Sequence, residues 1–237
     1  MGPSCYVFFD VDDTLVEWTT SWNGVFAQVA QEAGVAATDE DAWKALTQAF
    51  TTIYGDAIRE HAGRGDLHEF WVDYDGRILA LMGVERELRK HAERVVELLQ
   101  HPGSIRLFPE AREVVEELTA TGARLGIVTG RPLAGPDLDL LGIRHHFDPV
   151  IDAFAMGSIK AEGHMFARAA RVAAQCGCVG WHVGDHYDDD VAGARKAGLR
   201  PVLVDRRGAY PDADCPRITD LRSLFQIIPL EPTDDAS

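Results

Sequence analysis

The sequence lacks several features that mark common classes of protein. It has no run of more than two consecutive lysines or arginines, and its 23 lysines and arginines are outnumbered by 38 acidic residues, which gives a net charge of −15. No apolar run approaches the roughly 18 residues that a membrane-spanning helix requires, and the first residues lack the basic segment of a secretion signal. The composition therefore argues against nucleic acid or an anionic membrane surface as a partner.

Cysteine is also scarce. The chain has four cysteines, Cys5, Cys176, Cys178 and Cys215. Their spacing is neither that of a zinc site nor that of a disulfide framework. Reduced thiols are typical of the cytoplasm, so we expect a cytoplasmic protein.

What the sequence does contain is an alternation of short apolar runs with helical patterns. The apolar runs have the length and composition of strands buried on both faces of a sheet; they are 5–9, 123–129, 149–154, 180–184 and 200–204. The helical patterns lie between them, at 109–122, 164–177 and 189–199. This alternation predicts an α/β fold with a doubly wound parallel sheet, in which ligands bind at the carboxyl ends of the strands.

Residues 17–104 break the alternation. They hold helix-like segments at 21–34, 39–55 and 84–100, and we expect no strand among them. The sequence therefore predicts an α-helical domain, 17–104, inserted into an α/β core made of 1–16 and 105–228. We expect the tail, 229–237, to be disordered.

One stretch, FFDVDDTLV, places three carboxylates directly after an apolar run. Asp10, Asp12 and Asp13 follow residues that favour a buried strand. Carboxylates that lie this close repel one another, and burial without a partner is costly. Either the cluster is exposed to solvent or a cation lies among the carboxylates.

Chemically distinctive residues also follow the later strands. Thr129 ends the second strand, Lys160 follows the third, and Asp185 and 188–190 follow the fourth. Because the carboxyl ends of parallel strands meet at one edge of a sheet, we expect these side chains to lie near Asp10 and Asp12.

Four segments, FFDVDDTL, IVTG, GSIK and GDHYDDDVAGARKAG, resemble in order and spacing the four motifs of the haloacid dehalogenase (HAD) superfamily. The helical insertion after the first motif is similar to the C1 cap of its subfamily I, and the motifs are most similar to those of the phosphatases in that subfamily. Two positions depart from the pattern. Ala161 follows Lys160 where the family often has proline, and Gly130 follows Thr129 where asparagine is common.

The resemblance implies a Mg²⁺-dependent phosphatase that hydrolyses a small phosphorylated metabolite, a phosphomonoester, through an aspartyl-phosphate intermediate. The expected catalytic residues are Asp10 as the nucleophile, Asp12 as the general acid and base, Thr129 and Lys160. Thr129, Gly130 and Lys160 would bind the phosphate group.

The same resemblance implies a set of Mg²⁺ ligands. These are the carboxylates of Asp10, Asp185 and Asp190 and the backbone carbonyl of Asp12, with Asp189 as the fallback for Asp190. Mg²⁺ prefers such oxygen ligands and would account for the clustered carboxylates.

Three other functions remain open. A sugar phosphomutase would use the same scaffold and the same residues. A 2-haloacid dehalogenase is disfavoured because those relatives lack an acid at the position of Asp12. A phospho-receiver signalling module is disfavoured because its phosphorylated aspartate lies on the third strand and it has no large helical insertion.

Overall fold

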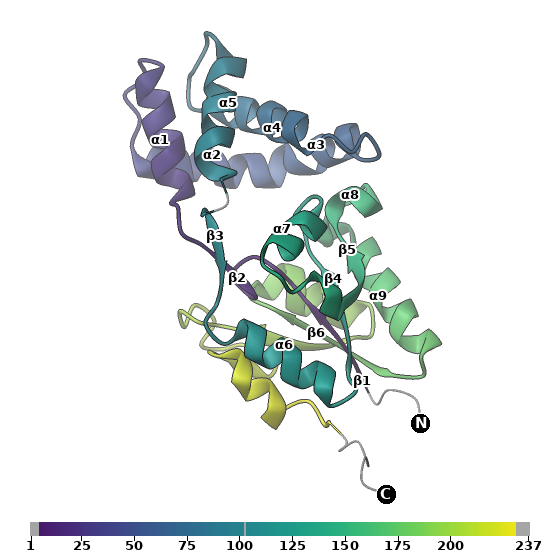
Figure 1. Cartoon of the computed structure of the whole chain (residues 1–237). Coiled ribbons are helices and arrows are strands. Elements are labelled where there is room, and N and C mark those ends of the chain that lie inside the picture. The colour runs from purple at the N-terminus through teal and green to yellow at the C-terminus, as the bar shows by residue number, and fades with distance from the viewer. Residues whose placement is uncertain (1–4, 102, 231–237) are drawn as a thin grey trace, which may run out of the picture. The chain divides into compact units, whose positions relative to one another are not determined.

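The computed structural model describes residues 5–101 and 103–230. The chain forms two compact units (Figure 1). The core unit comprises Met1–Glu17 and Arg106–Ser237, and the helical unit comprises Trp18–Ile105. The predicted disordered tail falls mostly on 231–237, which lies outside the described residues.

The core unit is built on a six-stranded sheet of order β5-β4-β1-β6-β7-β8. Each strand runs parallel to its neighbours. The strands are β1 Cys5–Phe9, β4 Arg124–Val128, β5 Phe147–Ile151, β6 Val179–Gly184, β7 Arg200–Val204 and β8 Arg217–Ile218. All five residues of β1 are buried, as expected for a central parallel strand. The predicted doubly wound α/β fold is confirmed.

Helices connect these strands. They are α6 Ala111–Ala120, α7 Ala134–Leu140, α8 Ala153–Met156, α9 His164–Gln175 and α10 Gly193–Lys196. The chain moves toward β5 through α6 and α7, and back toward β8 through α9 and α10 (Figure 1). Because parallel crossovers are right-handed, the two pairs of helices cover opposite faces of the sheet.

The strand order brings four carboxyl ends to one edge. The strand β1 lies between β4 and β6, and the backbone of Asp10 extends its ladder by donating to the carbonyl of Val183 at 2.9 Å. Thr129 likewise continues β4 by donating its backbone N–H to Ile151 at 3.0 Å. The backbone therefore fixes where both side chains begin.

Two predicted elements are wrong in detail. The third strand ends at Ile151 rather than at residue 154, because the Asp152 side chain accepts the N–H of Ala155 at 2.8 Å and caps α8. In place of an α-helix over 189–199, a π-helix η3 covers Tyr187–Ala192 and continues into α10. Turns of π-helix are rare in proteins, but those that do occur often lie at functional sites.

The described residues of the helical unit form five helices. They are α1 Trp22–Glu32, α2 Asp39–Thr52, α3 Tyr54–His61, α4 Leu67–Leu81 and α5 Leu88–Leu99. Residues 39–55, which the sequence pattern joins, divide into α2 and α3 at Ile53. The helix α4 was not predicted from the sequence, because its buried side includes the polar residues Tyr74 and Asp75, which obscure the apolar pattern.

A short two-stranded ladder lies where the chain passes from one unit to the other. It pairs β2 Val16–Trp18 with β3 Ile105–Leu107. The expectation of no strand within 17–104 is therefore wrong at its first residues. Among the described residues, no helix is both long and apolar enough to span a membrane.

Asp75 gives a first testable prediction, because it is an unpaired acid on α4. It is 2% exposed and its Oδ1 has no hydrogen-bond partner. Burial raises the pKa of its carboxyl well above the usual value. Between the unfolded and the folded pKa the folded state holds an extra proton, so stability falls by about 1.4 kcal/mol per pH unit as pH rises.

We therefore expect Asp75→Asn to raise the free energy of unfolding, measured by urea denaturation, more at about pH 8 than at about pH 5. Asp73→Asn is the matched control, because Asp73 lies on the same helix but is more exposed and pairs with Arg77 at 2.8 Å. Asp73→Asn should not raise the free energy of unfolding at either pH. Equal effects of Asp75→Asn at the two pH values would contradict the prediction.

Candidate functional site

Asp10 and Lys160 form a buried ion pair at the carboxyl edge of the sheet. Asp10 follows β1 and is 4% exposed. The Nζ atom of Lys160, in the short helix η2 Lys160–Glu162, donates to its Oδ1 at 2.5 Å. The structure thus brings the end of the first strand together with the lysine that follows the third.

Lys160 also contacts a second acid, Asp190 of η3. Its Nζ lies 2.7 Å from Oδ1 of Asp190. Burial disfavours the charge on Lys160, but the carboxylates of Asp10 and Asp190 outweigh burial and raise the pKa of this lysine. The ammonium group therefore stays charged while it bridges two carboxylates.

Asp190 is held in place by several groups of the fourth segment. His182 on β6 contacts its Oδ1 through Nε2 at 2.9 Å, and the backbone N–H of His186 donates to its Oδ2 at 3.1 Å. Burial would raise the pKa of Asp190, but the charge of Lys160 and the hydrogen bond from His182 hold it below the usual range. The Asp190 carboxyl packs against the backbone of Gly184. A Cβ atom at position 184 would lie 2.3 Å from Cγ of Asp190. Only glycine fits at this position without displacing Asp190.

Asp185 completes a cluster of three acids. Ligand oxygens of Asp10, Asp185 and Asp190 all lie within 4.8 Å of one another. Burial, with further contributions from neighbouring carboxylates, raises the pKa of Asp10 to about 7 and that of Asp185 to about 8. Lys160 alone does not offset three carboxylates, so a cation at this point would favour their ionised forms.

The donor set of this cluster fits a hard divalent cation. It offers three carboxylates from the ends of β1 and β6 and from η3. Oxygen-only sets of this kind are typical of Mg²⁺, Mn²⁺ or Ca²⁺ sites. Asp189, the fallback ligand, is not part of the cluster. Its backbone N–H donates a hydrogen bond to Nδ1 of His186.

Thr129 and Gly130 lie at the end of β4. Thr129 is 1% exposed, and its Oγ1 accepts the backbone N–H of Arg131 at 3.2 Å. That bond leaves the hydroxyl proton of Thr129 for another acceptor. Around Gly130 no atom lies within 4 Å of the place that a Cβ would occupy, so the space beside its backbone is open.

Asp12 contacts Arg131. Nε of Arg131 donates to Oδ2 of Asp12 at 3.3 Å, and Nη2 donates to Oδ1 at 3.0 Å. Arg131 is not among the site residues predicted from the sequence. An available signal was an arginine two residues after a strand-end threonine, in a chain with several acids at the same sheet edge.

His182 was also missed as part of the site. Its position in β6 suggested only the ordinary alternation of a strand. In the structure its side chain is fully buried, contacts Asp190 and packs edge-on against Phe166 at 4.9 Å between ring centroids. Burial lowers the pKa of His182, which favours the neutral ring.

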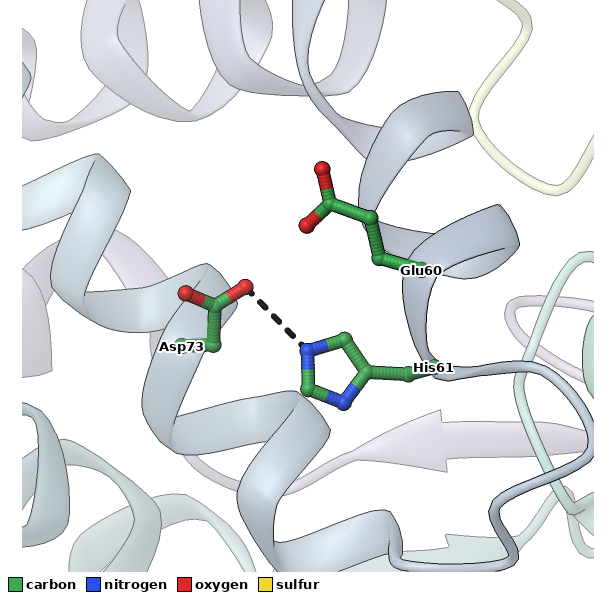
Figure 2. Close-up of side chains that lie close together, drawn as sticks. All are labelled: Glu60, His61 and Asp73. Carbon is green, nitrogen blue, oxygen red and sulfur yellow. Dashed lines mark hydrogen bonds and ion pairs between the residues drawn. The ribbon is translucent and has the colours of Figure 1, made fainter.

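A second cluster of possible ligands lies in the helical unit. Glu60 and His61 project from α3 toward Asp73 on α4, and the His61 Nε2 lies 3.3 Å from Oδ2 of Asp73 (Figure 2). Arg77 pairs with both Glu60 and Asp73. These side chains line a pocket of about 580 Å³. The Arg77 guanidinium already pairs with both acids of this cluster, which is therefore explained as an ion-pair network.

Comparison with known proteins identifies the family. The chain is 29% identical over 230 residues to human haloacid dehalogenase-like hydrolase domain-containing protein 3, covering 93% of this chain and 88% of the relative. It is 28% identical over 208 residues to a glyceraldehyde 3-phosphate phosphatase of Methanothermobacter thermautotrophicus, covering 84% of each chain. Its fold matches the crystal structure of a HAD phosphatase from Thermococcus onnurineus, with a TM-score of 0.63 and 24% identity over 97% of this chain and 100% of the other.

A family model described as haloacid dehalogenase-like hydrolase matches residues 6–198, which include all four motifs. The resemblance to the HAD superfamily is confirmed. The chain is an enzyme that belongs to the haloacid dehalogenase-like hydrolases.

Proposed function

We propose that this chain is a Mg²⁺-dependent phosphatase that hydrolyses a small phosphomonoester through a phosphorylated Asp10. The observation that carries the proposal is the placement of Asp10. This residue directly follows the central strand β1, and its carboxyl contacts Lys160 and belongs to the three-acid cluster. The names of relatives support the choice of reaction, since one of them is a glyceraldehyde 3-phosphate phosphatase.

In the proposed first step the Asp10 carboxylate attacks phosphorus and the substrate alkoxide leaves. Asp12, two residues further along the chain, gives that alkoxide its proton. Lys160 and the Thr129 hydroxyl stabilise the negative charge on the phosphate oxygens. In the second step water attacks the phospho-enzyme, Asp12 takes a proton from that water, and Asp10 and inorganic phosphate are released.

Asp10, Asp185 and Asp190 would hold Mg²⁺, with the backbone carbonyl of Asp12 as a further ligand. When bound, Mg²⁺ would neutralise charge on the acids and on the phosphate group. We further propose that the core unit carries the chemistry and that the helical unit is the cap that selects the substrate.

The test is a screen of phosphorylated metabolites, glyceraldehyde 3-phosphate among them, with and without Mg²⁺. We expect kcat/KM to be measurable for at least one compound, and we expect a chelator to stop turnover until Mg²⁺ is restored. Mg²⁺ should also raise Tm, because it binds the assembled acids and not the unfolded chain. Turnover that survives exhaustive chelation would contradict the metal assignment.

Asp185→Asn and Asp189→Asn form a matched pair for the metal site. Both substitutions remove one carboxylate from the fourth motif, but only Asp185 belongs to the cluster. We expect Asp185→Asn to raise the Mg²⁺ concentration for half-maximal activity by about 10-fold or more, and Asp189→Asn to change it by less than about 3-fold. The same order should hold for the Mg²⁺-dependent rise in Tm.

A further inference from the structure

Arg131 is a buried arginine that joins two acids of the core unit. Its side chain is 5% exposed. One edge of the guanidinium, Nε and Nη2, faces both carboxylate oxygens of Asp12, at 3.3 and 3.0 Å. The remaining nitrogen, Nη1, donates to Asp137 on α7 at 2.8 Å. The guanidinium is thus fixed from both sides.

The backbone around Asp12 is also held. Leu15 and Val16 both donate to the carbonyl of Val11, and Asp13 donates to the carbonyl of Val16 at 2.8 Å. The Asp12 side chain, in contrast, is 37% exposed. Arg131 donates a hydrogen bond to each of the two carboxylate oxygens of Asp12 and so fixes the plane of the carboxyl group.

We propose that Arg131 is the positioning residue for the Asp12 carboxyl, and this inference rests on the acid–base role of Asp12 in the proposed function. Arginine suits this task because it has no acceptor atom and is not deprotonated in proteins. Its two hydrogen bonds occupy two of the four lone-pair sites of the carboxylate. Two hydrogen bonds to a carboxylate fix its plane and still permit the group to take up and release a proton.

The inference predicts a specific kinetic signature. Without Arg131 the Asp12 carboxyl loses the two hydrogen bonds that fix its plane, so proton transfer slows while the attack by Asp10 does not. Arg131→Met should therefore lower kcat on an alkyl phosphate by about 10–100-fold, which is less than the roughly 10²–10⁴-fold loss expected when the acid–base group itself is removed. On p-nitrophenyl phosphate, whose leaving group needs no proton, the rate of the first step, measured as the initial release of p-nitrophenol, should fall by less than about 3-fold. Arg131→Lys keeps the positive charge but lacks the planar guanidinium that donates two hydrogen bonds at once. This variant should retain more activity on the alkyl phosphate than Arg131→Met.

A double-mutant cycle with Asp12→Asn tests whether Arg131 acts through Asp12. In the Asp12→Asn background, adding Arg131→Met should change kcat by less than about 2-fold, because the two residues act as one unit. The matched control is Arg206→Met. Arg206 is also a mostly buried arginine of the core unit, and it pairs with a buried acid, Glu110, at 2.7 Å. We expect its replacement to lower Tm and to affect both substrates equally.

The outcomes separate this inference from the proposed function. A leaving-group effect in Asp12→Asn but not in Arg131→Met, or independent losses in the cycle, would overturn the role of Arg131 and leave the phosphatase in place. A wild-type enzyme that hydrolyses neither ester would overturn both. If Arg131→Met does not fold, as judged by thermal melting, Asp137→Asn replaces it. Asp137→Asn weakens the contact between Asp137 and Nη1 of Arg131. It should also lower the activity on the alkyl phosphate more than the first step on p-nitrophenyl phosphate, but by a smaller factor than Arg131→Met.

Discussion

Asp10→Asn is expected to abolish turnover while the protein still folds. The substitution is nearly isosteric and replaces the proposed nucleophile with an amide. Losses of roughly 10⁴–10⁶-fold in kcat are typical when a covalent nucleophile is removed. Stability should not suffer in the absence of metal, because burial already raises the pKa of Asp10 to about 7 and disfavours its charge. The measurements are kcat with saturating Mg²⁺ and Tm with a chelator present.

Asp13→Asn is the matched control for this experiment. Asp13 lies three residues further along the chain and adopts a φ of 54°. Asparagine tolerates that left-handed conformation, so the backbone is retained. Asp13 is not a member of the three-acid cluster, and we expect its replacement to change kcat by less than about 3-fold, a small loss beside that of a removed nucleophile. Near wild-type activity in a clean preparation of Asp10→Asn would exclude Asp10 as the nucleophile.

Asp12→Asn is expected to show a loss that depends on the leaving group. Without Asp12 the departing alkoxide has no proton source, and the water that attacks the phospho-enzyme has no base. Removing such a group typically costs about 10²–10⁴-fold in rate. We expect a loss of this size on an alkyl phosphate and a much smaller loss of the first step on p-nitrophenyl phosphate.

Pre-steady-state kinetics separate the two roles of Asp12. Because hydrolysis of the intermediate also slows, Asp12→Asn should release about one equivalent of p-nitrophenol per site in a burst before a slow steady state. Asp10→Asn should give no burst, since no phospho-enzyme can form. Equal losses on both substrates, with no phospho-enzyme detected by mass spectrometry, would mean that Asp12 shapes the site without transferring protons.

The two acids differ in their surroundings, which explains why two residues of one motif have different expected roles. Asp10 is buried and contacts the Lys160 ammonium. Asp12 is partly exposed and contacts the Arg131 guanidinium. A nucleophile benefits from a fixed, water-poor position, whereas a group that exchanges protons with a leaving group and with water needs access to both.

The sequence by itself determined the fold class and most of the acidic site. Short β-rich runs separated by amphipathic helices allow few arrangements other than a parallel sheet. In such a sheet the residues that follow the strands must meet at one edge. Asp10, Lys160, Asp185 and Asp190 could be grouped for this reason, although they span most of the chain.

The tertiary structure alone decided which partner each of these residues takes. The pairing of Arg131 with Asp12 joins residues 119 positions apart, and no local pattern encodes it. The burial of His182 beside Asp190 depends likewise on how β6 and η3 pack. The raised pKa values of Asp10 and Asp185 come from desolvation, which is a property of the packed site and not of the residue type. Local periodicity reports secondary structure, whereas contacts between distant segments and the exclusion of water exist only after the chain has folded.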